Sequence, residues 1–230
     1  MAVQNPLSIG EIAQDLKSDT FREELRSAWS IALLYRAPAV PVVWVAARLG
    51  LGPMQVTFAA LLVALLLPVV AVGLPLAVAP VTLCLCGMLF QVLDCADGML
   101  ARATGRSTKL GGDMDFLIDM AQWGLLYLSL GLLADRVLDT GWYWAMIGAA
   151  AAWGRLYARV VRDRLKEDDA AEPSAPGLWD YPALFLAGIS GLIPFIALTG
   201  SWIGYWVGAL LVYSILDSLE GLLPLFKRRA

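Results

Sequence analysis

The sequence predicts an all-α integral membrane protein with six transmembrane helices, preceded by an N-terminal amphipathic interfacial helix. Hydrophobic residues make up 59% of the 230 positions and charged residues only 16%, and the mean hydropathy is +0.68. This composition is too apolar for an ordinary soluble domain. The stretch 49–93 contains no Asp, Glu, Lys or Arg, which is enough for two spans of about 20 residues each. A hairpin through the bilayer follows.

Residues 1–53 are expected to form a cytosolic and interfacial segment. From Ile12 to Leu34, apolar residues recur among charged ones in a pattern suited to a helix at the membrane surface; a soluble cap helix is the alternative. The apolar stretch 29–49 is interrupted by Arg36 and Arg48 and is too short to span. The first twenty residues are mixed polar rather than a signal peptide, so we expect the N-terminus to stay in the cytosol.

Residues 54–230 are expected to form the transmembrane domain. Each predicted span is bounded by Gly, Pro or charged residues. The spans are 54–72, 76–100, 111–134, 141–161, 180–199 and 202–221. The acidic segment Lys166–Gly177 is expected to be a cytosolic loop.

The placement of cations supports this topology. With the N-terminus inside, every Lys and Arg except Arg136 falls on the cytoplasmic side, as the positive-inside rule requires. Both termini are then cytosolic. Trp142 and Trp202 lie near the outer ends of their spans, as in an aromatic belt. The polar segment 94–119 faces the cytosol, so we expect substrates to arrive from the cytosol or the inner leaflet.

Histidine and cysteine usage limits the chemistry. The sequence has no histidine, which excludes Ser-His-Asp and Cys-His catalysis and argues against a zinc site. The three cysteines, Cys84, Cys86 and Cys95, are clustered and odd in number, so they do not suggest a disulfide framework. Acid–base chemistry must therefore come from carboxylates.

Four carboxylates lie near the end of the second predicted span and the start of the third: Asp94, Asp97, Asp115 and Asp119. Within each pair the spacing of three or four residues places both side chains on one helical face. A short polar connection should make the helices adjacent, so that all four converge. Grouped carboxylates repel one another unless a cation neutralises them, and oxygen-only ligands suit Mg²⁺ or Mn²⁺, with two ions expected. Intramembrane polar residues without chemistry are the alternative.

The residues between these carboxylates suit a diphosphate. Gly98 and Gly111 remove side chains where a phosphate could approach the backbone, and Arg102 supplies a forked donor. Ala101 permits close packing, and Thr108 can add a contact from the connection.

The whole segment resembles the motif of the CDP-alcohol phosphatidyltransferase family: Asp, two residues, Asp-Gly, two residues, Ala-Arg, eight residues, Gly, three residues, Asp, three residues, Asp. The motif positions are filled here by Asp94, Asp97, Gly98, Ala101, Arg102, Gly111, Asp115 and Asp119. Eight specified residues at fixed spacings form a highly specific signal. The six spans and the interfacial helix also resemble the family's architecture.

The resemblance implies a phospholipid-biosynthetic membrane enzyme that moves a substituted phosphate group from a CDP-linked donor to an alcohol and releases CMP. It also implies a homodimer, and we expect a bacterial inner-membrane location and no nucleic-acid partner. Asp119 would be the general base. The expected metal ligands are Asp94, Asp97, Asp115 and Asp119, and the residues expected at the CDP moiety are Asp97, Gly98, Ala101, Arg102, Thr108 and Gly111.

The sequence departs from the family at one further position. Members often have Pro-Asn, two residues, Thr at the start of the first span, and here Met54 replaces the Asn between Pro53 and Gln55. Either a nucleotide contact is missing or Gln55 supplies it, with Thr57 as the matching threonine.

Three arginines at helical spacing are candidates for binding the acceptor alcohol. Arg155, Arg159 and Arg162 can form one cationic stripe near the cytosolic end of the fourth predicted span, which a phosphorylated alcohol would need. Positive-inside anchors are the alternative. The arginines favour CDP-diacylglycerol with a polar alcohol over a CDP-choline or CDP-ethanolamine donor acting on a lipid alcohol.

Two other protein classes compete with this interpretation. An intramembrane prenyltransferase also holds a lipid diphosphate with aspartates and Mg²⁺, but such proteins usually carry two separated Asp-rich motifs. A divalent-cation transporter could line its pathway with acids, but it would not require Gly98, Ala101, Arg102 and Gly111 at these spacings.

Overall fold

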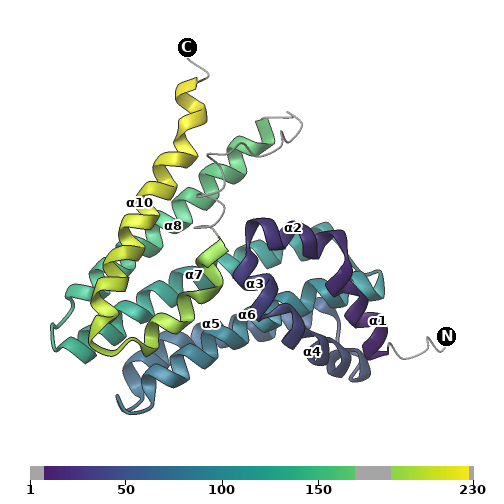
Figure 1. The fold of residues 1–230 in the computed structure, drawn as a ribbon, viewed down its shortest axis with the longest axis horizontal. Coiled ribbons are helices and arrows are strands. Elements are labelled where there is room, and N and C mark those ends of the chain that lie inside the picture. The colour runs from purple at the N-terminus through teal and green to yellow at the C-terminus, as the bar shows by residue number, and fades with distance from the viewer. Residues whose placement is uncertain (1–7, 169–187, 228–230) are drawn as a thin grey trace. The chain divides into compact units, whose positions relative to one another are not determined.

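The computed structural model describes residues 8–168 and 188–227, and this part of the chain is built of helices and their connections. Figure 1 shows the helices in chain order. They are α1 (Ile9–Ala13), η1 (Gln14–Lys17), α2 (Asp19–Ser27), α3 (Trp29–Leu34), α4 (Arg36–Arg48), α5 (Pro53–Gly73), α6 (Ala79–Thr104), α7 (Lys109–Leu138), α8 (Tyr143–Asp168), η2 (Ile189–Leu198), η3 (Gly200–Trp202) and α10 (Ile203–Lys227). The predicted all-α class is confirmed for the described residues.

The described residues form two compact units. Unit 1 comprises residues 8–64, 86–119 and 188–194, and unit 2 comprises residues 65–85, 120–168 and 195–227. The long helices α5, α6 and α7 contribute to both units. All four motif aspartates and the helices before α5 belong to unit 1.

The N-terminal region is a series of short helices instead of the single helix predicted from Ile12 to Leu34. Serine caps explain part of this difference. The Ser18 hydroxyl accepts a hydrogen bond from the Phe21 backbone N–H at 3.2 Å and starts α2, because a serine side chain competes with the helix for backbone donors. A second break occurs at Ala28, whose backbone leaves the helical region (φ −141°, ψ 48°).

A capping box begins α1. The Ser8 hydroxyl accepts the Glu11 backbone N–H at 3.2 Å, and the Glu11 carboxylate accepts the Ser8 backbone N–H at 2.7 Å. These hydrogen bonds from the backbone and hydroxyl of Ser8 lower the pKa of the Glu11 carboxyl, because they favour its charged form. This helix start is therefore fixed locally.

Helix α4 joins the N-terminal region to the helices that carry the motif. Its 13 residues are too few to cross a bilayer, since a span needs about 20, which agrees with the sequence prediction. Ala39 and Val43 of α4 are fully buried and share a core with Ala96, Met99 and Leu100 of α6. The hydrophobic effect thus holds the N-terminal region against α6.

Four stretches of the described chain are long and apolar enough to cross a membrane: Pro53–Gly73, Ala79–Thr104, Lys109–Leu138 and Gly200–Leu222. They correspond to the first, second, third and sixth predicted spans. Helix α8 covers the fourth prediction, but its arginines lower its mean hydropathy below that of these four. Of the fifth, residues 180–187 lie outside the described residues and Ile189–Leu198 forms a short 3₁₀ helix. The count of six spans therefore stays a prediction.

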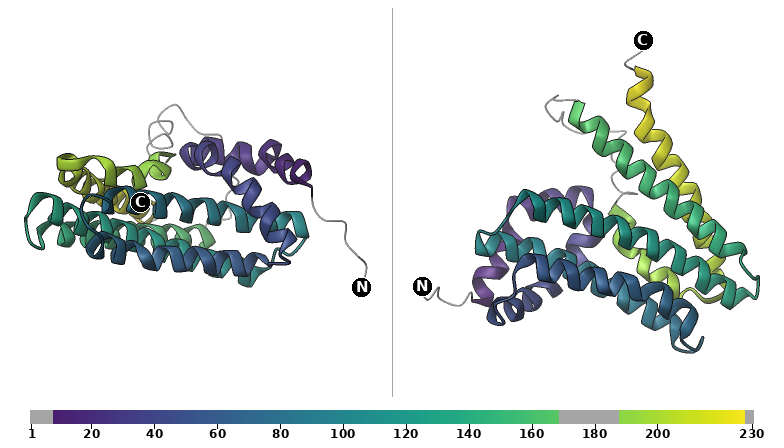
Figure 2. Two further views of the ribbon diagram at one scale, coloured as in Figure 1. Left: turned by 90° about the horizontal axis from the view of Figure 1, so that it is seen from below. Right: turned by 180° about the vertical axis from the view of Figure 1, so that it is seen from behind.

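Small residues let the helices of unit 2 approach closely. A Cβ on Gly148 would lie 2.6 Å from the Tyr127 carbonyl oxygen of α7, and one on Gly154 would lie 3.1 Å from the Ser214 Cβ of α10. Helices α8 and α10 run side by side (Figures 1 and 2). Close approach of this kind is typical of packed membrane helices.

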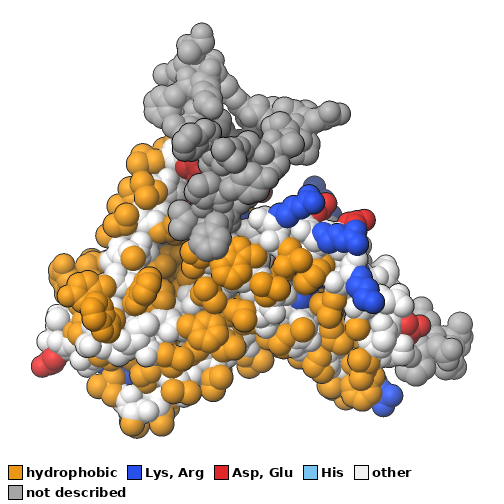
Figure 3. Space-filling model, viewed as in Figure 1, with side chains coloured by type: hydrophobic (Ala, Val, Ile, Leu, Met, Phe, Trp, Pro, Cys, Tyr) orange, Lys and Arg blue, Asp and Glu red, His pale blue; other side chains and the backbone are white. Residues whose placement is uncertain are grey.

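Hydrophobic side chains cover much of the visible surface, and the charged ones on this face gather over the N-terminal helices (Figure 3). On α5, for example, Phe58 and Leu62 are 46% and 64% exposed. An apolar exterior of this extent is expected where lipid tails replace water.

Two consecutive polar residues near the end of α7 bind helix termini in unit 2. The buried carboxylate of Asp135 accepts the backbone N–H groups of Trp144 and Ala145 at 3.0 and 2.8 Å and the Thr140 hydroxyl at 2.8 Å. The guanidinium of Arg136 donates to the carbonyl oxygens of Ala71 and, at 2.8 Å, Leu74 at the end of α5. Arg136, the one cation predicted outside, is thus used to satisfy a helix terminus.

Replacing Asp135 with Ala should lower the free energy of unfolding by about 1–3 kcal/mol, because the buried N–H groups that start α8 lose their acceptor. Thermal unfolding of the detergent-purified variant measures this. Thr140→Ala is the matched control and should cost less, since it leaves both N–H groups paired. Equal stability of Asp135→Ala and the parent protein would contradict the capping role.

Candidate active site

A tight turn brings the end of α6 beside the start of α7. Helix α6 ends in a Schellman motif: Gly105, with φ of +64°, donates its N–H to the Arg102 carbonyl at 3.2 Å, and Arg106 donates to the Ala101 carbonyl at 2.9 Å. Helix α7 begins at Lys109, and the Thr108 hydroxyl caps it by accepting the Gly111 N–H at 3.0 Å. The predicted adjacency of the two motif halves is confirmed.

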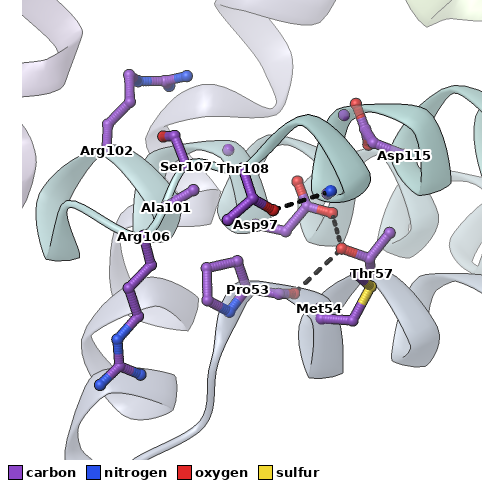
Figure 4. A pocket seen from close by; sticks show the side chains of 13 residues that line it. Pro53, Met54, Thr57, Asp97, Ala101, Arg102, Arg106, Ser107, Thr108 and Asp115 are labelled. Atoms are coloured by element: carbon purple, nitrogen blue, oxygen red, sulfur yellow. Dashed lines mark hydrogen bonds between the residues drawn. The ribbon is translucent and has the colours of Figure 1, made fainter.

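A cavity of about 390 Å³ lies where α5, α6 and α7 meet in unit 1. Figure 4 shows the side chains around it. The lining residues are Pro53, Met54, Thr57, Asp97, Gly98, Ala101, Arg102, Arg106, Ser107, Thr108, Gly111, Gly112 and Asp115. Every residue predicted at the CDP moiety is among them.

The carboxylates approach the cavity from two helices. Asp97 of α6 and Asp115 of α7 line it, whereas Asp94 and Asp119 lie outside its lining. Asp97 is 5% exposed and the other three are partly buried. The strongest charges that act on Asp94 are all negative, and come from Asp119, Asp115, Asp97 and Glu24 in that order.

This charge distribution fits a hard cation. A partly buried carboxylate surrounded by negative charges calls for a positive ion, and the donors offered are all oxygen. Among the described residues, no three acidic or cysteine side chains form a ready-made metal cluster. The donor chemistry thus fits Mg²⁺ or Mn²⁺. Of the four predicted ligands only Asp97 and Asp115 line the cavity, so the convergence of all four on a metal stays a prediction.

Thr57 of α5 orients Asp97. The threonine hydroxyl lies 2.6 Å from Asp97 Oδ2 and 3.1 Å from the Pro53 carbonyl oxygen (Figure 4). This contact joins α5 to the motif carboxylate on α6. The sequence named Thr57 only through the family pattern.

Met54 stands where family members often have Asn, and its side chain and that of Gln55 have different surroundings. The Met54 side chain lines the cavity, whereas the Gln55 side chain accepts the Gly52 backbone N–H at 2.7 Å and helps begin α5. Gln55 therefore does not take the place of the usual Asn, and a thioether stands at that position.

Both motif glycines border a polar side chain. A Cβ on Gly98 would lie 3.3 Å from Arg102 Nη1, and one on Gly111 would lie 3.1 Å from Thr108 Oγ1. The first turn of the 30-residue helix α7 borders the cavity, with Gly111 and Gly112 leaving its backbone open. Helix N-termini attract anions through their N–H groups and the helix dipole.

The motif arginine contacts the N-terminal region. Arg102 donates from Nε and Nη2 to the carboxylate of Asp15 at 3.0 and 3.2 Å, and Asp15 also pairs with Arg36. Burial works against the charge of Arg36, but the hydrogen bond and charge of Glu24, together with the charge of Asp15, raise its pKa above the usual value. Asp15 and Arg102 are 87 residues apart, and the sequence offered no signal for this contact.

The three arginines proposed for the acceptor lie on α8 in unit 2. Arg155 and Arg162 both pair with the buried Asp217 of α10, and the Arg155 Cζ lies 5.8 Å and 5.4 Å from the ring centroids of Trp123 and Tyr213. Two members of the predicted stripe thus share one internal partner.

Comparison with known proteins identifies the family. The CDP-alcohol phosphatidyltransferase family model matches residues 51–214, more than half of the chain. The chain belongs to this family. CDP-alcohol phosphatidyltransferases are transferases that act on CDP-alcohol substrates in a lipid environment and generally need a divalent metal. A search of the curated proteins found no match.

Replacing Thr57 with Val should reduce the rate of CMP release by about tenfold, because the shape is kept while the hydrogen bond to Asp97 is lost. Steady-state assays of the purified variant measure this. Thr57→Ser, which retains the hydroxyl, is the control and should stay within about threefold of the parent. Equal rates for Val and Thr at this position would contradict the orienting role.

Proposed function

We propose that the protein transfers a phosphatidyl group from CDP-diacylglycerol to the hydroxyl of a polar alcohol, with release of CMP. The observation that carries the proposal is the cavity at the α6–α7 turn, in which motif carboxylates, glycines and arginine face one space. In this reaction the acceptor oxygen forms a bond to the β-phosphorus, the bond from that phosphorus to the CMP oxygen breaks, and the acceptor proton leaves.

Four carboxylates would hold the metal: Asp94, Asp97, Asp115 and Asp119. When bound, Mg²⁺ or Mn²⁺, expected as two ions from the set of four carboxylates, would neutralise the diphosphate and make CMP a better leaving group. Thr57 holds Asp97 in a fixed orientation within this set.

The diphosphate would lie against the start of α7. The guanidinium of Arg102 is the charged donor there, and the dipole of α7 favours an anion at this end of the helix. Ala101, Gly98 and Thr108 border the same space, and the absence of a side chain at Gly98 leaves room for the phosphate.

Asp119 would act as the general base. It follows Asp115 by one helical turn and so lies on the same face of α7. It would take the proton of the acceptor hydroxyl as that oxygen attacks, with no covalent enzyme intermediate.

The topology and assembly in this proposal follow the sequence. Six spans, cytosolic termini and a cytosolic active site in a bacterial inner membrane remain expectations from the positive-inside pattern, and a homodimer remains an expectation from the family. The interfacial position of residues 8–53 is supported by the charged side chains around α2.

The acceptor is proposed to be a polar, phosphorylated alcohol bound through Arg155, Arg159 and Arg162. Since Asp217 already pairs with Arg155 and Arg162, an anionic acceptor would have to share or replace that carboxylate. A neutral alcohol would leave the ion pairs as they are.

One experiment tests the proposal and its alternatives. Purified protein is incubated with CDP-diacylglycerol and Mg²⁺ or Mn²⁺ against a panel of neutral and phosphorylated alcohols, and CMP and the lipid product are measured. A parallel reaction with CDP-choline and diacylglycerol tests the opposite arrangement of nucleotide and lipid. Release of CMP in neither reaction, with uptake of divalent ions into vesicles, would favour the transporter class.

Replacing Asp119 with Asn should abolish turnover while leaving the affinity for CDP within about threefold, because the amide can ligate but cannot accept the proton. CMP release and calorimetric titration with CDP and Mg²⁺ measure the two effects. Asp113→Asn, an exposed position on the same helix, is the control and should keep full activity. Full activity of Asp119→Asn would refute its assignment as base.

Replacing Asp94 with Ala should remove the Mg²⁺ dependence of CDP binding, because the metal loses an anionic ligand. Titrations with CDP in Mg²⁺ and in EDTA should give the same weak affinity for the variant and different affinities for the parent. Asp113→Ala serves as the matched change. An unaltered response to Mg²⁺ would contradict a ligand role for Asp94.

A further inference from the structure

Asp15 links two arginines of unit 1 through one carboxylate. Its Oδ1 accepts Arg102 Nε at 3.0 Å, and its Oδ2 accepts Arg102 Nη2 at 3.2 Å as well as Arg36 Nη1. The Asp15 side chain is 16% exposed. Such a bidentate contact fixes both the position and the plane of a guanidinium.

The Asp15 carboxylate is itself held in place by Arg36. Arg36 has a side-chain exposure of 3%, and its remaining edge donates from Nε to Glu24 at 2.8 Å and from Nη2 to the second oxygen of the same carboxylate. A buried guanidinium held on two sides has little freedom to move. Asp15 is therefore a fixed support for Arg102 rather than a mobile counterion.

The contact also decides which part of Arg102 is left for a ligand. The Nε–Nη2 edge is taken by Asp15, whereas Nη1 lies beside Gly98, 3.3 Å from the position of an added Cβ. Gly98 and Arg102 both line the cavity. With the other edge held by Asp15, the Nη1 end of the guanidinium is the part left for a ligand.

We infer that Asp15 is a positioning residue for the nucleotide site, which holds the Arg102 guanidinium with Nη1 directed at a phosphate of the CDP-linked donor. The inference rests on the proposed function, in which Arg102 binds that diphosphate. At 39% side-chain exposure an arginine would otherwise sample many rotamers. Fixing it beforehand removes an entropy cost from binding.

Replacing Asp15 with Ala should raise the Kd for CDP in Mg²⁺, and the KM for the CDP-linked donor, by about tenfold, because one charge-assisted hydrogen bond is weakened. The kcat should change by less than about threefold, since ground state and transition state lose the contact alike. Asp15→Glu should recover part of the affinity.

A double-mutant cycle separates positioning from packing. In the Arg102→Ala background, Asp15→Ala should change the Kd for CDP by less than about twofold, because the residue through which it acts is absent. A similar loss in both backgrounds would show that Asp15 supports only the fold, and would overturn the inference.

Two control variants account for charge and stability. Asp19→Asn removes a carboxylate that pairs with Arg22 at 90% side-chain exposure, and it should leave the Kd unchanged. Glu24→Gln weakens the support of Arg36 without touching Arg102, and it should lower thermal stability more than CDP affinity. All variants are compared below the unfolding temperature of the least stable one.

The results also distinguish this inference from the proposed function. If the parent binds CDP but releases no CMP from either donor, the proposed reaction fails while the effect of Asp15 on the Kd still decides the inference. If Asp15→Ala binds CDP as tightly as the parent, the inference fails and the reaction stands. If the parent does not bind CDP in Mg²⁺, both fail.

Discussion

Repulsion among carboxylates is the constraint around which unit 1 is organised. Asp94 experiences mainly negative charges from its neighbours, on a helix that is apolar and long enough to cross a membrane. Such an arrangement is unfavourable unless other contacts hold it and a cation completes it. The holding contacts are the hydrogen bond between the Thr57 hydroxyl and Asp97 and the buried packing of α4 on α6. The oxygen-only donor set is suited to a hard divalent cation.

The N-terminal region contributes to the site as well as to the fold. Its buried apolar residues share a core with the motif-bearing half of α6, and its Asp15 carboxylate contacts Arg102. Hydrophobic packing places the segment, and the ion pairs then determine the direction of one side chain. Removal of residues before α5 would therefore disturb both the packing on α6 and the position of the Arg102 side chain.

The sequence predicted the parts of the site that depend on local spacing. Carboxylates three or four residues apart share a helical face, and a short polar connection brings neighbouring helices together, so the cavity at Asp97 and Asp115 was foreseeable. Contacts between distant residues were not. The pairing of Asp15 with Arg102, and of Asp135 with the start of α8, depends on packing that no periodicity encodes. The predicted N-terminal helix is interrupted because the Ser18 cap outweighs the continuing amphipathic pattern.

The turn between α6 and α7 explains why the family's motif can be recognised at all. Gly105 and Arg106 close one helix and Thr108 opens the next, so only Ser107 lies between the two caps. One residue more or less within the first turn of α7 would rotate the following carboxylates by about 100° about the helix axis, away from the cavity. The interval of eight residues between Arg102 and Gly111 is thus a length set by backbone geometry. The capped turn keeps the motif residues of α6 and α7 in a fixed register.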